Sequence, residues 1–250
     1  MSTIAVLGVG PGLGMSVAQR FAKEGYAVGL VSRSADRHPG YLEALAGSGV
    51  RTVAVAADLR APGAIAQALA EITSELGPVD VVYHGPGAHD LSTPTVGILE
   101  TGPADIRRAT AEIVEPAAEV ASLVLPTMRS RGSGSLVYVS GLSALVPLPF
   151  LGPYGPASAA LRTYARTLAA AVAEEGNEAV RIGSLVVGGL IERGDIHQML
   201  TEPGAPAPFA TLDPDEIADA VWRLASGVED EVVFDVLSAP ASEAPVSGDR

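Results

Sequence analysis

The fold is decided by the stretch Thr3-Ile4-Ala5-Val6-Leu7-Gly8-Val9-Gly10-Pro11-Gly12-Leu13-Gly14 at the start of the chain. An apolar run of strand length, residues 4–7, ends in a glycine-rich turn, and residues 13–24 then show helical periodicity. Glycines in such a turn permit a tight bend and let N–H groups at the helix start approach a phosphate closely. Alternatively, they serve only the close packing of helix on strand. The order of strand, glycine turn and helix predicts the first unit of an α/β sheet.

Further apolar runs of strand length alternate with longer helical segments along the chain. The strands are predicted at residues 27–31, 51–56, 79–83, 135–139, 180–186 and 231–237. The helices are predicted at residues 61–76, 103–131, 157–175 and 213–226, the last with Asp213 as N-cap and Pro214 at its first position. This alternation predicts a doubly wound, Rossmann-type parallel sheet of about seven strands with helices on both faces, in three layers. We expect one domain over residues 1–238 and a flexible tail over residues 239–250.

The composition excludes several kinds of partner. The net charge of -13 repels nucleic acid and anionic membranes, so we expect neither as a partner. The absence of cysteine rules out disulfides and thiolate chemistry, and no histidine and carboxylate spacing suggests a metal site. The first strand leaves no room for a signal peptide, and no apolar run is long enough to span a membrane. We therefore expect a cytoplasmic protein.

Residues after the second and third strands bear on the choice of nucleotide. The second strand runs into Arg33 with no acidic residue to hold a ribose 2′-hydroxyl, which favours NADP over NAD. The alternative is an ordinary exposed arginine. Asp58 and Leu59 follow the third strand, where they could contact an adenine ring, although aspartate is also common in turns.

Taken together, these motifs resemble the short-chain dehydrogenase/reductase family. The resemblance covers residues 3–237 and rests on Gly8, Gly12 and Gly14, Asp58-Leu59, Gly85-Pro86-Gly87, Leu125-Pro126-Thr127-Met128, Ser135-Leu136-Val137-Tyr138-Val139-Ser140, Tyr154 and the helix start from Asp213 to Ala218. It implies binding of NAD or NADP, action on small alcohols or carbonyls, and assembly into dimers or tetramers. The implied cofactor-binding residues are Gly8, Gly10, Gly12, Leu13, Gly14, Arg33, Asp58, Leu59 and Gly85.

The catalytic positions depart from the family pattern. Tyr154 stands at the position of the family's acid/base tyrosine, but Ser158 replaces the lysine four residues later. Gly141 stands at the usual serine position and Ile113 at the asparagine position. The nicotinamide-binding turn after the sixth strand is also changed, to Val187-Gly188 with Glu192 in place of a threonine. The nucleotide half of the site thus keeps the family pattern better than the redox half.

Tyr154 is predicted to be protonated at neutral pH, because Ser158 has no charge to lower the phenol pKa. It can donate a proton but would be a slow base. Ser140 or Ser143 could orient a substrate, or be ordinary polar groups at a strand end. His84, at the end of the fourth strand, is the other acid/base candidate, with His89-Asp90 in the next loop; the alternative for these histidines is a surface position.

The segment 141–153 is apolar and follows the fifth strand. It could form a wall of a substrate pocket at the carboxyl ends of the strands, or pack a subunit interface or core edge. The predicted substrate-binding residues are Gly141, Leu142, Ser143, Phe150, Ser158, Gly188 and Glu192. Because residues 142–151 offer no cation, we expect an apolar, uncharged substrate, with polyketide tailoring as a plausible setting.

Three hypotheses for function remain open at this point. The first is a small-molecule enzyme that uses Tyr154, with Ser140 or His84, for isomerisation, cyclisation or dehydration without hydride transfer. The second is an NADPH-dependent carbonyl reductase with a non-standard site. The third is a silent NADP-binding scaffold or regulator. The cofactor, if there is one, is NADP(H), but the chemistry could be non-redox and the cofactor absent.

Overall fold

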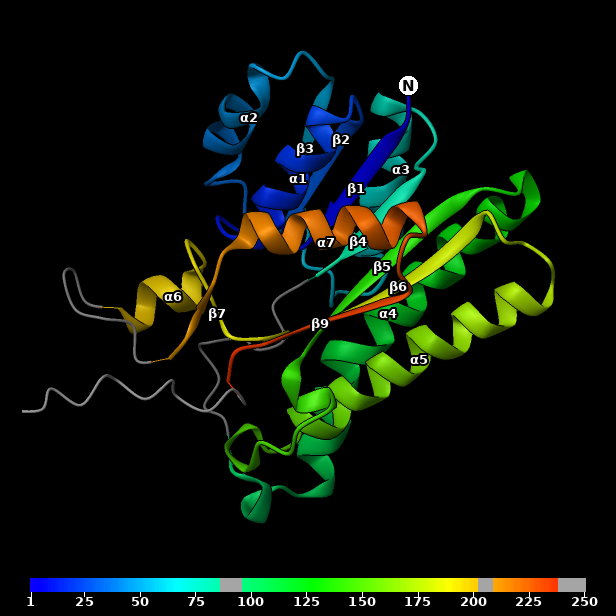
Figure 1. Cartoon of the computed structure of the whole chain (residues 1–250). Coiled ribbons are helices and arrows are strands. Elements are labelled where there is room, and N and C mark those ends of the chain that lie inside the picture. The colour runs from blue at the N-terminus through cyan, green and yellow to red at the C-terminus, as the bar shows by residue number, and fades with distance from the viewer. Residues whose placement is uncertain (86–95, 202–208, 238–250) are drawn as a thin grey trace, which may run out of the picture.

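All seven predicted strands pair in one parallel sheet in the computed structural model, which describes residues 1–85, 96–201 and 209–237 (Figure 1). The order across the sheet is β3-β2-β1-β4-β5-β6-β9. The strands are β1 (Thr3–Leu7), β2 (Ala27–Ser32), β3 (Thr52–Ala56), β4 (Val81–His84), β5 (Gly134–Gly141), β6 (Val180–Gly188) and β9 (Glu231–Asp235). A separate pair, β7 (Leu190–Ile191) and β8 (Thr211–Leu212), was not predicted. Such two-residue strands are too short to show an alternating pattern.

The helices are α1 (Leu13–Lys23), α2 (His38–Ala46), α3 (Ala64–Leu76), α4 (Pro103–Arg131), α5 (Tyr154–Glu174), α6 (Asp195–Leu200) and α7 (Pro214–Ser226). Short 3-10 turns are η1 (Ile98–Glu100), η2 (Leu142–Ala144) and η3 (Pro149–Leu151). Helix α5 begins at Tyr154, three residues before the predicted start, because Pro156 is tolerated in a first turn. Helices α2 and α6 were missed, since each is short. The predicted cap of α7 is confirmed, because the Asp213 side chain accepts a bond from the Asp215 amide.

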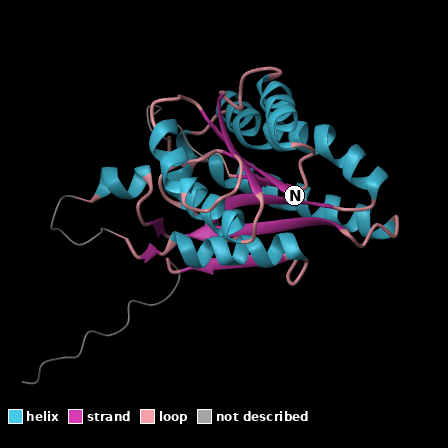
Figure 2. Ribbon diagram, turned by 90° about the horizontal axis from the view of Figure 1, so that it is seen from above, coloured by secondary structure: helices cyan, strands magenta, loops and turns pink. Residues whose placement is uncertain are grey.

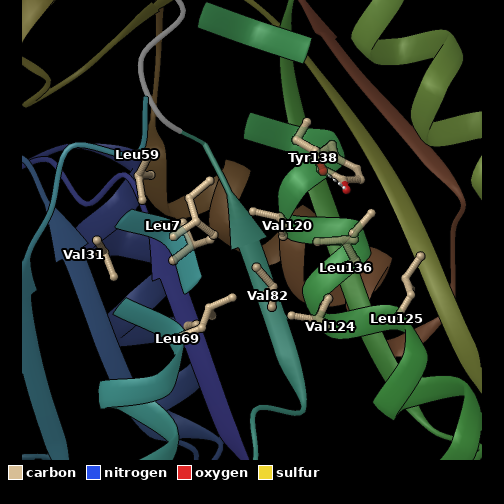
Figure 3. Packing of buried hydrophobic residues seen from close by; sticks show 14 of the residues in the cluster. Leu7, Val31, Leu59, Leu69, Val82, Val120, Val124, Leu125, Leu136 and Tyr138 are labelled. Atoms are coloured by element: carbon tan, nitrogen blue, oxygen red, sulfur yellow. Dashed lines mark hydrogen bonds between the residues drawn. The ribbon is translucent and has the colours of Figure 1, made fainter. Parts of the chain in front are cut away.

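Helices cover both faces of the sheet, as Figure 2 shows from above, and a layer of apolar side chains is buried on each face. One layer packs α3, α4 and α5 on the sheet, and its side chains include Leu69, Val120 and Leu136 (Figure 3). The other packs α1, α2 and α7 on the opposite face. Strands covered on both faces read as continuous apolar runs, which is why they could be located from the sequence. The predicted three-layer, doubly wound fold is confirmed.

From β1 the chain adds β2 and β3 on one side of the sheet, and from β4 it adds β5, β6 and β9 on the other side. The direction of the strand order thus reverses between β1 and β4, which pair in the middle of the sheet. In such sheets, ligands bind beyond the carboxyl ends of the strands at this switch point. The glycine loop after β1, His84 at the end of β4 and the turn after β5 therefore lie at one edge of the sheet. His89 and Asp90 fall outside the described residues, as does the predicted tail.

Arg162 has a structural role on α5. Its guanidinium donates two hydrogen bonds to the Glu231 carboxylate, at 2.8 and 2.7 Å, which joins α5 to the edge strand β9. In the part of the chain that the structure describes, no helix is both long enough and apolar enough to cross a bilayer.

Candidate functional site

The glycine loop forms the predicted turn between β1 and α1. Gly8 has φ +97°, and the amides of Gly8 and Val9 both donate to the carbonyl of Val31 on β2, at 3.0 and 2.8 Å. A methyl group on Gly14 would lie 2.8 Å from the Cα of Val9, whereas no atom of the described residues lies within 4 Å of one on Gly10. Gly14 is therefore needed for close packing of α1 on the loop, and Gly10 faces open space.

The loop offers backbone donors at the positive end of α1. The amides of Gly10, Gly12 and Leu13 have no hydrogen-bond partner among the described residues. Free N–H groups at a helix start are suited to an anion such as a phosphate. The chemistry of the donors thus agrees with the predicted phosphate-binding role of this loop.

The space above Gly12, however, is filled by the chain itself. A methyl group on Gly12 would lie 3.0 Å from the carbonyl oxygen of Glu192 and 3.0 Å from the Cα of Gly194. Gly12 is the middle glycine of the pattern Gly8, Gly12 and Gly14, the one that lets a pyrophosphate come close to the backbone, and here the backbone of residues 192–194 packs against it. Amide donors suited to a phosphate and a close backbone contact at Gly12 thus occur in the same loop, and binding of a dinucleotide stays a prediction.

The predicted adenosine-side residues lie after β2, β3 and β4. Asp58 accepts a hydrogen bond from Arg60 and lies near Arg33; although partial burial opposes it, these contacts hold the pKa of Asp58 below its usual range. Leu59 is buried in the core and packs rather than facing solvent. Gly85 follows β4, and a methyl group there would overlap the Tyr83 hydroxyl. Whether these residues hold a nucleotide stays a prediction.

Tyr154 is buried at the start of α5, and its hydroxyl donates a hydrogen bond of 2.9 Å to Oε2 of Glu112 on α4. Burial raises the pKa of Tyr154, and Glu112 raises it further, because a nearby carboxylate disfavours the phenolate. The tyrosine is thus a proton donor at neutral pH, as the sequence analysis expected. Sequence reasoning missed Glu112, which directly precedes Ile113 at the family's asparagine position.

Arg108 on α4 is a cation that acts on Tyr154. It lies one helical turn before Glu112 on α4, interacts with the Tyr154 hydroxyl and lowers the pKa of Tyr154 against the larger opposing effects. Its guanidinium also pairs with Asp105, at 3.2 Å. An uncharged substrate was expected because residues 142–151 contain no cation. Arg108 on α4, however, brings a cation to the site. Helical spacing of four between Arg108 and Glu112 was the signal available in the sequence.

The two candidate serines have different surroundings. The hydroxyl of Ser140, at the end of β5, is buried and donates a long bond of 3.5 Å to the Leu185 carbonyl. Ser143 lies in η2, about 4.0 Å from where a methyl group on Gly155 would stand, and Gly155 directly follows Tyr154. A methyl group on Gly141 would lie 3.6 Å from the Ser143 hydroxyl oxygen. Ser143 is therefore the serine beside the start of α5, and Ser140 faces β6.

His84 is buried at the end of β4, with its ring edge-on to Tyr138 and their centroids 5.6 Å apart. Neither ring nitrogen has a hydrogen-bond partner among the residues that the structure describes. Burial lowers the pKa of His84 to about 4, because the interior disfavours the cation. The proposed surface position for His84 is wrong, and the histidine is neutral at physiological pH. Its predicted catalytic role stays a prediction.

The remaining predicted substrate-binding residues divide into buried and exposed ones. Leu142 is buried and packs directly on Gly188, where a methyl group would lie 2.6 Å from its side chain. Ser158 is buried one turn after Tyr154 and carries no charge. Glu192 accepts a hydrogen bond of 2.8 Å from Thr211 on β8. These contacts are structural, and a role of the three in substrate binding stays a prediction.

Phe150 belongs to an exposed apolar surface formed by η1 and η3. Phe150 is 63% exposed and Leu99 on η1 is 94% exposed. The two turns are held together at Gly152, which has φ +51° and leaves no room for a side chain against the carbonyl of Val96. An apolar surface next to the start of α5 is suited to an apolar ligand.

Fold and site together define an α/β protein with a nucleotide-type glycine loop after β1 and a buried tyrosine, paired with a carboxylate, at the start of α5. A model described as short chain dehydrogenase matches residues 2–199. The chain belongs to the short chain dehydrogenase family.

Individual proteins that are similar to this chain have low sequence identity to it. An uncharacterized oxidoreductase of Mycobacterium tuberculosis is 29% identical over 228 residues, which are 88% of this chain and 84% of that protein. The ketoacyl reductase HetN of a Nostoc species is 25% identical, with 92% and 77% covered. Among solved structures, acetoin dehydrogenase from Enterobacter cloacae has a TM-score of 0.78 at 20% identity, with 94% of each chain covered. L-sorbose reductase from Gluconobacter frateurii, solved with NADPH and L-sorbose, has a TM-score of 0.74 at 23% identity, covering 94% and 95%.

Proposed function

We propose that this protein is an acid/base enzyme of the short chain dehydrogenase family that transfers protons rather than hydride on an apolar carbonyl compound. The observation that carries the proposal is the hydrogen bond from Tyr154 to Glu112, together with Ser158 at the lysine position. A carboxylate beside the phenol opposes the phenolate that the family's lysine stabilises. The pair is instead suited to passing protons between substrate and carboxylate.

The step that this geometry supports is enolisation. The Tyr154 oxygen takes a proton from the carbon next to the substrate carbonyl while the phenol proton passes to Glu112. The electron pair of the broken C–H bond forms the C=C bond of an enolate, whose oxygen carries the negative charge. Arg108 is the nearby cation that stabilises this charge. With a β,γ-unsaturated ketone the enolate is a dienolate, and return of the proton from Glu112 through Tyr154 to the γ-carbon shifts the double bond. With a β-hydroxyketone the same proton passes to the β-hydroxyl, which leaves as water while the enolate electrons form the C=C bond.

Deuterium exchange tests this proposal without knowledge of the final product. Apolar cyclic ketones and β-hydroxyketones are incubated with the protein in D₂O without any nucleotide, and exchange next to the carbonyl is followed by NMR. We expect exchange that Tyr154→Phe abolishes and Glu112→Gln slows about 100-fold, the usual size of a general base contribution. Exchange that is unchanged in both variants contradicts the proposal.

A second candidate is an NADPH-dependent carbonyl reductase, the activity class named for several relatives. The free amides of Gly10, Gly12 and Leu13, with Arg33 after β2, favour it. Consumption of NADPH with the same ketones, measured by absorbance, distinguishes it from the first proposal. The substrate identity, assembly into dimers or tetramers and a preference for NADP belong to the same set of proposals.

A further inference from the structure

The segment from residue 191 to residue 195, here named the strap, crosses the glycine loop. It begins at the end of β7 and leads into α6, which Figure 1 shows apart from the main sheet on the side of α2. At its centre, the carbonyl oxygen of Glu192 and the backbone of Gly194 lie against Gly12. A carbonyl oxygen carries partial negative charge, so it presents to the start of α1 the same sign of charge as a phosphate oxygen.

Several contacts from different elements hold the strap in place. Arg193 pairs with Asp215 at 2.8 Å and donates to the Ser16 hydroxyl on α1 at 3.3 Å. Asp195 pairs with Arg37, next to α2, at 2.7 Å. The backbone amide of Glu192 also donates a hydrogen bond to the Leu212 carbonyl on β8, at 3.0 Å. The strap is thus tied to α1, α2, α7 and β8.

The strap also carries backbone strain. Arg193 has φ +63°, the only positive φ of a non-glycine residue in the described part of the chain. A non-glycine residue in the left-handed region costs free energy and persists only where its surroundings hold it. The ion pair with Asp215 and the hydrogen bond to Ser16 hold Arg193 in this conformation, so removing them favours release of the strap.

We propose that the strap occupies the place of a dinucleotide pyrophosphate and excludes the dinucleotide, so that the glycine loop serves as an anchor for the chain's own backbone. The inference deepens the proposed function, because a site closed to nucleotide is consistent with chemistry that needs no hydride. Gly12 and Gly14 are then kept in the sequence for close backbone contact, one with the strap and the other with Val9.

Calorimetric titration with NADP and NADPH tests this inference. The wild-type protein is compared with Arg193→Ala/Asp195→Ala, which removes the tethers to α1, α7 and α2 while Arg33 and the glycine loop stay intact. The matched control is Arg162→Ala, which breaks a comparable ion pair with Glu231 far from the loop. Hydrogen exchange of residues 190–200 reports in parallel whether the strap is released.

We expect undetectable or millimolar binding by the wild-type protein and by the control, and binding at least about 10-fold tighter by the released variant, because the competent fraction of molecules rises. Micromolar binding by the wild-type protein overturns the inference. So does a released variant whose strap exchanges fast but which still binds no nucleotide. The proposed acid/base function is judged separately, by proton exchange in Tyr154→Phe and Glu112→Gln.

Discussion

The two halves of the crevice differ in what sequence and structure have kept. After β1, the glycine pattern is intact, yet the backbone of residues 192–194 lies on Gly12. After β5, the lysine and serine positions are changed, yet Tyr154 stands at the start of α5 with a carboxylate partner from α4. The half that keeps its motif has the chain's own backbone packed against Gly12, and the half that has lost its motif holds a tyrosine hydrogen-bonded to a glutamate.

This difference indicates that a sequence motif is stronger evidence for a backbone geometry than for a bound ligand. Gly14 is required by Val9 whether or not a phosphate binds, so packing alone suffices to keep it. A catalytic pair, by contrast, needs only two side chains within hydrogen-bond reach, and these can come from any two elements that meet.

The largest expected effect concerns His84, which lies on β4 between the two halves. Its pKa is about 4 in the folded protein, against about 6.5 in an unfolded chain. Between these values the unfolded chain binds a proton that the folded protein does not, so the stability is full above pH 6.5 and decreases as the pH falls towards 4. We expect a loss of about 3 kcal/mol from this residue, measured by urea unfolding at pH 7 and pH 4.

The control for this prediction is His84→Leu, which removes the titrating group and keeps an apolar side chain in the buried position. The variant should lose stability more gradually with falling pH than the wild-type protein. Carboxylates with lowered pKa, such as Glu231, which is held by Arg162, contribute their own loss at acid pH in both proteins. Equal pH dependence in the two proteins contradicts a neutral, buried His84.

The next effect separates two glycines of the same loop. Gly14→Ala places a methyl group 2.8 Å from the Cα of Val9 and should lower the free energy of unfolding by about 2 kcal/mol, as overpacking does. Gly10→Ala meets nothing within 4 Å and should change stability by less than about 0.5 kcal/mol. Chemical unfolding measures both. Similar losses in the two variants mean that the loop is not held as tightly at Gly14 as the structure indicates.

The sequence was sufficient to predict the sheet, because strands buried on both faces are continuous apolar runs. The resemblance to the family singled out Tyr154 as well, and its catalytic role stays a prediction. The sequence could not reveal Glu112 as the partner, since 42 residues separate the two and only the packing of α4 against α5 brings them together. Likewise, nothing local in residues 191–195 indicates that they cross a loop almost 180 residues earlier. Contacts between distant segments depend on tertiary packing, which periodicity does not encode.

A smaller effect distinguishes the serines in the half that contains Tyr154. Ser143 lies beside Gly155, whereas the Ser140 hydroxyl is directed to the Leu185 carbonyl on β6. Ser143→Ala should therefore slow proton exchange on a ketone substrate about 10-fold, which corresponds to about 1.4 kcal/mol. Ser140→Ala should leave the rate within about twofold, and the rate of exchange in D₂O compares the two. A larger loss with Ser140→Ala assigns the orienting role to Ser140 instead.

The smallest effect on stability is expected at the ion pair that joins the strap to the start of α2. Arg37 pairs with Asp195, and both side chains are about half exposed, so Arg37→Ala should change the free energy of unfolding by less than about 0.5 kcal/mol. The same substitution frees the end of the strap next to α6, so amides of residues 195–200 should exchange faster while those of α1 stay unchanged. Hydrogen exchange followed by mass spectrometry measures both segments in one experiment. A faster exchange in α1 as well would mean that the strap stabilises the glycine loop itself, and unchanged exchange in α6 would mean that Arg193 holds the strap without Arg37.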